Sequence, residues 1–195
     1  RPNVLARAML TGKSKIIGLV VAYLDNHFYP TVLELLSEAL EKEGYHVLVF
    51  MARLTSENVD SLLEELLDYQ VDGIIMASVA MSTDLAARCE ASGVPVVLIN
   101  RSQDDPRLSA VTSDNFAGGK QVAEFLVAGG HNRIGHIAGW EGASTTRDRE
   151  QGFLVGLAEC GKQLFAREEG KCHFDSAQDA ARRMFALPDK PDAVL

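Results

Sequence analysis

The feature that most constrains the fold is the regular alternation, along the chain, of short apolar runs with helical stripes. Six runs rich in apolar and β-branched residues are predicted as strands, at 16–24, 46–51, 73–77, 94–99, 110–112 and 134–138. Within these runs apolar residues mostly follow one another instead of alternating with polar ones. This continuity is typical of parallel strands that are covered on both faces.

Helical patterns fill the gaps between the predicted strands. Apolar residues recur with a 3.6-residue period at 32–40 and 59–67, and weaker stripes lie at 85–89, 122–126, 153–157 and 180–185. Gly44 is placed to end the first helix, and Thr55 or Ser56 to begin the second. The resulting order of strands and helices predicts an α/β fold built on doubly wound parallel sheets.

The chain is long enough to form two lobes with separate cores, since it has 195 residues. Four βα units precede residues 114–116, and a new series of strands begins at 133–139. We therefore expect a first lobe over 15–115, a second lobe over 116–195 and a separate segment over 1–14. Residues 191–195 read as the beginning of a further strand, so we expect the second lobe to be incomplete in this chain.

Charge and cysteine content exclude several classes of protein. With a formal net charge of −8, the bulk of the chain does not suit a polyanion, so any contact with nucleic acid must come from a local segment. Three cysteines without a C-x-x-C pair argue against a disulfide framework or a zinc site and favour a reducing compartment. No apolar run has membrane-spanning length, and no signal peptide is visible, although the chain does not begin with Met.

The motifs of nucleotide-binding and catalytic sites are missing from the sequence. Residues 12–14 look like the end of a phosphate-binding loop, but Arg7 stands where the first glycine belongs and the segment precedes a strand. No G-x-G-x-x-G follows the first predicted strand, and no G-x-S-x-G occurs. His131 and His136 have no partner at metal-ligand spacing and are interpreted as structural. The sequence therefore predicts a protein that is not an enzyme and that holds no cofactor or metal.

Polar side chains follow the predicted strands at the positions where open α/β sheets bind ligands. These positions are 23–29, Ser78, 100–101, 114–115 and 139–149. Amides, carboxylates and guanidinium groups are mixed there with aromatic rings, which suits a neutral polyhydroxylated or heterocyclic ligand. The alternative interpretation is that Asn100, Asp114 and Asn115 are turn and cap residues.

The first ten residues, RPNVLARAML, stand apart from the rest of the chain. Pro2 suits the first turn of a helix, but the helix is too short to be stable alone. Its charged residues, Arg1 and Arg7, are both positive in an otherwise acidic chain. The segment is either a frayed leader or a hinge that becomes helical against a partner, with Met9 or Leu10 available as an apolar wedge.

Several stretches together resemble the LacI/GalR family of bacterial transcriptional repressors, in order and over all 195 residues. They are RPNVLARAML, KIIGLVV, EKEGYHVLV, VDGIIMAS, GVPVVLINR, VTSDNFAGGKQVAEFLVAGGHNRIGHIAG and TRDREQGF. The resemblance implies a helix-turn-helix headpiece before Arg1, a hinge over 1–10 that orders on operator DNA, and an effector-binding core from Ile16 onward. That core would consist of two lobes resembling periplasmic sugar-binding proteins, in a cytoplasmic homodimer with no membrane partner.

The resemblance also implies roles for individual residues. The effector-binding residues would be Phe28, Tyr29, Asn100, Arg101, Asp114, Asn115, Thr145, Arg149 and Phe174. Met9 stands where the family usually has a leucine that wedges between base pairs, and Ala6 and Leu10 would flank it on the DNA. Ala143 stands where purine-sensing members place a charged contact, which favours a sugar as the effector.

These residues bear on three functions from different classes. The first is a ligand-responsive repressor, in which a small metabolite bound between the lobes changes the affinity for an operator. The second is a periplasmic sugar-binding component of a transporter, against which the basic residues Arg1 and Arg7 and the unpaired cysteines argue. The third, an α/β enzyme, lacks the motifs described above. The sequence favours the repressor.

Overall fold

The structure is a computed structural model that describes residues 12–22, 24, 27–52, 56–79 and 81–195. It contains two compact units, the first ending at Val111 and the second running from Thr112 to Leu195. The sequence predicts this division a few residues later, near 114–116. The two units are described separately.

The first unit is a five-stranded parallel sheet with the strand order β2-β1-β3-β4-β5. Its strands are β1 (Ile16–Val21), β2 (His46–Met51), β3 (Gly73–Ala77), β4 (Val96–Ile99) and β5 (Ser109–Val111). Its helices are α2 (Phe28–Lys42), α3 (Ser56–Asp68) and α4 (Thr83–Ala91). Each predicted strand of this unit is confirmed, although β1 ends at Val21 instead of residue 24.

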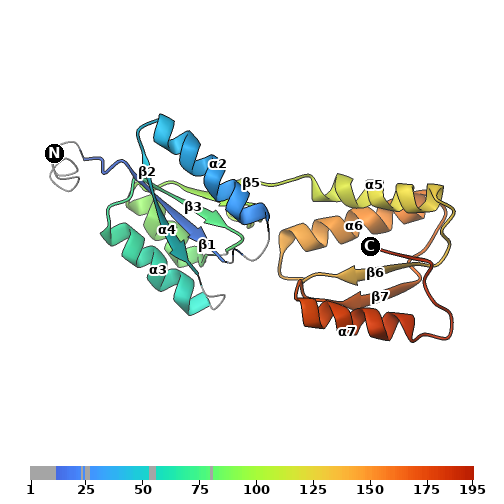
Figure 1. The fold of residues 1–195 in the computed structure, drawn as a ribbon. Helices are drawn as coiled ribbons and strands as arrows, with labels where there is room; N and C mark the ends of the chain where they lie inside the picture. Colours follow the sequence, from blue (N-terminus) through green and yellow to red (C-terminus); the bar gives the residue numbers. More distant parts are fainter. Residues whose placement is uncertain (1–11, 23, 25–26, 53–55, 80) are drawn as a thin grey trace. The chain divides into compact units, whose positions relative to one another are not determined.

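Helices cover both faces of this sheet, with α2 on one face and α3 and α4 on the other (Figure 1). The strand β1 explains why both faces are apolar. Leu19 and Val21 pack with Tyr29 of α2, whereas Val20 belongs to the cluster that contains Leu63 of α3 and Leu85 of α4. Because each face needs its own apolar residues, the strand reads as a continuous apolar run. The predicted doubly wound sheet is confirmed.

The second unit is a three-stranded parallel sheet with the order β7-β6-β8. Its strands are β6 (Ile134–Ala138), β7 (Ala166–Glu169) and β8 (Ala193–Val194), and its helices are α5 (Asn115–Ala128), α6 (Ser144–Glu159) and α7 (Phe174–Phe185). The buried core joins Ala123 of α5, Ile134 of β6, and Phe153 and Leu157 of α6. Strand β7 was not predicted, because its sequence AREE lacks an apolar run.

The helices α5 and α6 lie side by side at backbone distance (Figure 1). A Cβ atom at Gly119 would come within 2.0 Å of the Arg149 carbonyl oxygen, and one at Gly152 within 1.9 Å of the Phe116 carbonyl oxygen. Only glycine fits at these two crossing points, because any side chain would push the helices apart. The glycines therefore determine where Arg149 lies relative to α5.

None of the helices among the described residues is both long enough and apolar enough to cross a membrane.

Candidate functional site

Three side chains from three elements meet at the carboxyl edge of the first sheet. Ser78 directly follows β3, Asn100 directly follows β4, and Tyr29 lies in the first turn of α2. The Asn100 side-chain amide donates hydrogen bonds to Tyr29 Oη at 2.8 Å and to Ser78 Oγ at 3.1 Å. The Tyr29 and Ser78 hydroxyls are also hydrogen-bonded to each other. Each of the three groups therefore contacts the other two.

The backbone at two of these positions is strained. Ser78 has φ of 59° and Asn100 has φ of 70°, in the left-handed region that non-glycine residues seldom adopt. Such conformations persist when surrounding interactions hold them, and here the hydrogen bonds to Tyr29 supply that support. Tyr29 is only 3% exposed. Its buried hydroxyl therefore supports Ser78 and Asn100 from inside the protein.

Phe28 presents the open aromatic surface at this edge. Its side chain is 46% exposed, and its ring meets the edge of the Tyr29 ring with centroids 5.0 Å apart at 86°. The buried hydroxyl network and the exposed ring are adjacent, so this edge offers both an apolar face and hydrogen-bonding groups. That combination is found at sites for small polar ligands.

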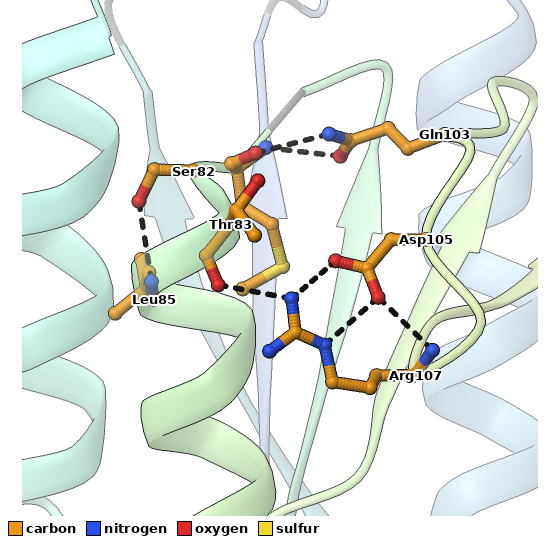
Figure 2. Close-up of polar contacts among 7 residues, drawn as sticks. Ser82, Thr83, Leu85, Gln103, Asp105 and Arg107 are labelled. Carbon is orange, nitrogen blue, oxygen red and sulfur yellow. Dashed lines mark hydrogen bonds and ion pairs between the residues drawn. The ribbon is translucent and has the colours of Figure 1, made fainter.

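The loop after Asn100 is held against the start of α4 (Figure 2). The Gln103 side chain accepts from the Met81 backbone N–H and donates to the Met81 carbonyl, both at 3.0 Å. Arg107 donates to Asp105 through Nε at 2.9 Å and Nη2 at 2.6 Å, and Nη2 also reaches the Thr83 carbonyl at 3.1 Å. Hydrogen bonding from Arg107 lowers the pKa of Asp105 to about 2.

We call these contacts of Gln103, Asp105 and Arg107 the loop latch. They replace the helix that usually connects two parallel strands, because residues 100–108 link β4 to β5 without one. Ser82 caps α4 at the same place, since its Oγ accepts from the Leu85 N–H at 3.2 Å. Arg101 begins the latched loop and is half-buried. The latch was not predicted, because Gln103 and Arg107 reach residues that lie 22 and 24 positions away along the chain.

In the second unit, the start of α5 meets the side of α6. Asp114 caps α5 by accepting a hydrogen bond from the Ala117 N–H at 2.9 Å. Asn115 donates to the Ser113 carbonyl at 3.0 Å and accepts from Arg149 Nη2 at 2.9 Å. The structure thus brings Asn115 and Arg149 together, 34 residues apart in sequence, and gives Asp114 the cap role that sequence analysis had kept open.

A cavity of about 200 Å³ lies beyond the carboxyl end of β6. It is lined by His136, Ile137, Ala138, Gly139, Thr146, Arg149, Gly170, Cys172, Ala177 and Leu195. Thr145, which was singled out from the sequence, is buried in the first turn of α6 and does not line this cavity, whereas the neighbouring Thr146 does. Because consecutive residues of a helix point in different directions, sequence alone does not distinguish the two.

The remaining predicted site residues lie elsewhere. Phe174 is the first residue of α7, is 78% exposed, and does not line the cavity. The hinge residues Ala6, Met9 and Leu10 lie outside the described residues. In the part of the chain that the structure describes, no three His, Cys, Asp or Glu side chains gather in a way that could hold a metal ion.

Parallel sheets with polar side chains beyond the carboxyl ends of their strands, as in the first unit, and a small cavity at such an edge, as in the second, are typical of α/β proteins that bind small molecules. Residues 14–195 match the family described as periplasmic binding proteins and sugar binding domain of LacI family. The chain belongs to this family, and its resemblance to the LacI-type regulators is confirmed.

Individual relatives carry the names of transcription regulators, not enzymes. The maltose regulon regulatory protein MalI of Escherichia coli K12 is 31% identical over 186 residues, which cover 95% of this chain and 54% of that protein. The structure of the transcriptional regulator CelR with cellobiose matches with a TM-score of 0.82 at 27% identity, over 93% of this chain and 58% of that one.

A further structure, a periplasmic binding protein/LacI transcriptional regulator from Alkaliphilus metalliredigens QYMF complexed with D-xylulofuranose, has a TM-score of 0.72 at 27% identity. It covers 82% of this chain and 58% of that one. The chain spans 54% to 60% of the length of the curated regulators that it matches.

Proposed function

We propose that this chain is the effector-binding core of a transcriptional repressor of the LacI family. The observation that carries the proposal is that proteins named as repressors or operon regulators align with 95% to 100% of the chain. The family description also includes periplasmic binding proteins, so the fold alone does not separate the two classes. The names of these aligned relatives favour the regulator over the transporter component.

The effector is a sugar or a sugar derivative. Support comes from the regulators of similar fold that were crystallised with cellobiose and with D-xylulofuranose, and from Ala143, an uncharged residue where a charged contact would favour purines. In the first unit, Phe28 covers an apolar face of the ligand, and Asn100 and Arg101 contact its hydroxyls. In the second unit, Arg149 and Asn115 bind ligand oxygens, with Thr145 and Phe174 as further contacts.

Two of the proposed effector residues act by positioning others. Tyr29 holds Asn100 through its hydroxyl at 2.8 Å, and Asp114 caps α5 and so orients Asn115. The proposed organisation has a hinge segment over 1–14, an N-terminal lobe over 15–115 and a C-terminal lobe over 116–195. The hinge residues Ala6, Met9 and Leu10 contact operator DNA, together with a headpiece outside this chain.

Regulation requires that the effector and the operator favour different states of the protein. An effector shifts such an equilibrium only to the extent that it binds one state more tightly than the other. We infer that the protein works as a cytoplasmic homodimer, because two hinges and two headpieces match the two half-sites of an operator. The protein needs no cofactor, catalyses no reaction and has no membrane partner in this role.

A gel-shift assay tests the proposal directly. The full-length protein is titrated onto the DNA upstream of its own gene, with and without cellobiose, maltose, ribose and fructose 1-phosphate. We expect specific binding that at least one of these compounds changes by tenfold or more. Absence of specific binding under all conditions, together with an export leader encoded before Arg1, would favour the transporter component instead.

A thermal-shift screen identifies the effector class. A ligand that binds only the folded state stabilises it by RT ln(1 + [L]/Kd), which is about 4 kcal/mol at a thousandfold excess over Kd. We expect a sugar or sugar derivative to raise the melting temperature, and nucleobases to leave it unchanged. Stabilisation by purines alone would contradict the assignment of a sugar.

A further inference from the structure

A single carboxylate holds the chain at the point where it enters the first unit. Asp72 lies between α3 and β3 and accepts hydrogen bonds from two consecutive backbone N–H groups, those of Ser14 at 2.8 Å and Lys15 at 3.1 Å. Its Oδ1 also accepts from the Ser14 hydroxyl at 3.2 Å, and the same hydroxyl oxygen accepts from the Ile16 N–H at 3.2 Å. We call these contacts of Ser14, Lys15 and Asp72 the entry anchor.

The backbone reinforces the entry anchor from both neighbouring strands. On the β3 side, the Asp72 N–H donates to the Ile16 carbonyl at 2.8 Å. On the β2 side, the His46 N–H donates to the Lys15 carbonyl at 2.8 Å. The Lys15 ammonium group also lies 4.2 Å from the centroid of the Tyr45 ring, close enough for a cation–π contact. The residues that lead into β1 are therefore held on both sides.

Lys15 has a backbone conformation that turns the chain. Its φ of 60° lies in the left-handed region that non-glycine residues seldom adopt. An extended strand does not continue in a straight line through such a residue. Conformations of this kind persist where surrounding contacts hold them, and here Asp72 and Ser14, which is only 4% exposed, supply those contacts. The entry anchor therefore sets the direction in which the chain joins β1.

Strand β3 connects the entry anchor to the candidate site of the first unit. Asp72 directly precedes β3, and Ser78 directly follows it at the other end. Ser78 belongs to the hydrogen-bonded network with Tyr29 and Asn100. Between these two ends, β3 pairs with β1 on one side and with β4 on the other. The anchor and the candidate site thus lie at opposite ends of one strand whose backbone is fixed on both sides.

We propose that Asp72 is a positioning residue for operator binding, because it fixes the point at which the proposed hinge over 1–14 joins the N-terminal lobe. The proposal rests on the proposed function, since it requires that the hinge contacts operator DNA. It extends that function to a residue 58 positions from Ser14 along the chain. Asp72 acts through Ser14 and Lys15, at the end of β3 opposite to the candidate site.

The expected effect follows from conformational freedom. A hinge that is held at its junction with the lobe loses less freedom on binding DNA than a hinge that is loose there. Fixing the backbone of one residue costs about as much free energy as a tenfold change in affinity. Release of Ser14 and Lys15 would therefore add this cost to operator binding, while the network around Ser78 would keep its contacts.

Two variants loosen the anchor in different ways. Asp72→Asn keeps the size of the side chain but replaces one carboxylate oxygen with an NH₂ group, which cannot accept the second N–H. Ser14→Ala removes the hydroxyl contact and keeps the carboxylate, so it decides the question if Asp72→Asn does not fold. Asp68→Asn is the control for charge, because Asp68 is exposed at the end of α3. Val59→Ala is the control for a general loss of stability, because Val59 is buried in the core.

Operator binding by the full-length protein is measured without effector, in a gel shift on the DNA upstream of its own gene. We expect Asp72→Asn to bind this DNA at least about tenfold more weakly than the natural protein does. Ser14→Ala should lose about threefold, as for one hydrogen bond. Asp68→Asn and Val59→Ala should bind as the natural protein does.

Hydrogen exchange of backbone amides, followed by NMR without DNA, shows whether the change is local. In Asp72→Asn the Ser14 and Lys15 amides should exchange at least about tenfold faster than in the natural protein. The Ser78 amide, which donates to the Ile99 carbonyl at 3.2 Å, should exchange at the natural rate. This pattern distinguishes a loosened anchor from a loss of structure throughout the first unit.

Three results would overturn the proposal. They are unaltered operator binding in both anchor variants, a loss of operator binding no larger than that of Val59→Ala, and exchange at Ser14 and Lys15 that stays as slow in Asp72→Asn as in the natural protein. If only Ser14→Ala folds, its unaltered operator binding has the same meaning. Failure of the proposed function is a different result, because the natural protein itself then does not bind the operator, and the inference falls with it. A natural protein that binds its operator, with anchor variants that bind equally well, contradicts only the inference about Asp72.

Discussion

Single side chains at the ends of the strands carry the proposed site, and several of them need support from buried neighbours. Tyr29, Ser78 and Asn100 illustrate this, since two strained backbone positions are joined through one tyrosine hydroxyl. The structure therefore separates residues that would touch an effector from residues that hold them. The two groups should respond differently to substitution.

The substitution Tyr29→Phe tests the supporting role. Removing the hydroxyl leaves the buried Ser78 hydroxyl and the Asn100 amide each with one partner fewer, which we expect to cost about 1–3 kcal/mol in the free energy of unfolding. Urea denaturation measures this loss. Tyr69→Phe is the control, because the Tyr69 side chain is 48% exposed, and its effect should stay within about 0.5 kcal/mol. Equal effects of the two substitutions would show that the network contributes no stability.

The substitution Arg149→Ala tests the binding role. Arg149 is exposed and donates a hydrogen bond to Asn115, so we expect a change of less than about 0.5 kcal/mol in stability. Operator binding should persist, whereas the response to the effector found by thermal shift should be lost. Arg147→Ala, two residues earlier on the same helix, should keep that response. Unfolding of Arg149→Ala would instead give this arginine a structural role.

At the scale of whole elements, Gly118 and Gly119 are neighbours on α5, but only Gly119 lies against α6. Gly119 faces the Arg149 carbonyl, where a Cβ would come within 2.0 Å, whereas a Cβ at Gly118 would meet nothing within 4 Å. We expect Gly119→Ala to destabilise the protein by at least about 2 kcal/mol through overpacking. Gly118→Ala should stabilise it by about 0.5–1 kcal/mol, because alanine favours helix. Chemical denaturation of both variants checks the opposite signs.

After the crossing of α5 and α6, the loop latch is the second structural feature that can be tested by substitution. Because hydrogen bonding from Arg107 lowers the pKa of Asp105 from 3.8 to about 2, the contact stabilises the fold above pH 4, and its contribution disappears as the pH falls toward 2. We expect Asp105→Asn to be less stable than the natural protein at neutral pH, with a difference that shrinks through this window. Denaturation at a series of pH values measures the difference. Asp104→Asn, at the exposed neighbouring position, is the control and should change the stability at neutral pH by less than about 0.5 kcal/mol.

At the scale of the whole molecule, the proposed function separates operator affinity from effector affinity. The substitution Met9→Gly removes the apolar wedge proposed for the hinge and leaves the effector-binding core unchanged. We expect it to weaken operator binding by about tenfold or more, since an inserted side chain is what stabilises a kinked base step. Effector affinity, measured by calorimetry without DNA, should stay the same. Unchanged operator affinity would remove Met9 from the DNA contact.

Much of the fold follows from local patterns, and the exceptions have a common cause. Strands β1 and β3 contribute apolar residues to the clusters on both faces of the sheet, so each reads as a strand on its own. Strand β7 carries the sequence AREE and pairs with β6 all the same. Its charged side chains find partners in other elements, such as Glu150 for Arg167. A strand whose polar groups are satisfied only by tertiary contacts has no local signal.

In the candidate site, too, some features follow from local sequence and others only from tertiary contacts. The rule that ligands bind beyond the carboxyl ends of parallel strands placed Asn100, Asn115 and Arg149 near such an edge from sequence alone. Which of these side chains meet depends on the crossing of helices far apart in the chain. His136 was interpreted as a structural histidine, and its sequence neighbours do not reveal that it lines a cavity.

The sequence by itself determined the order of strands and helices apart from β7, and the edges at which polar side chains gather, because periodicity and strand-end chemistry are local properties. The family followed from the resemblance of several stretches of the chain. Tertiary structure alone decided that Gly119 and Gly152 set the spacing of α5 and α6, that Tyr29 supports Asn100, and that Thr146 rather than Thr145 lines the cavity. The physical reason is that hydrogen bonds and close packing act over a few ångströms in space, between residues that the chain keeps far apart.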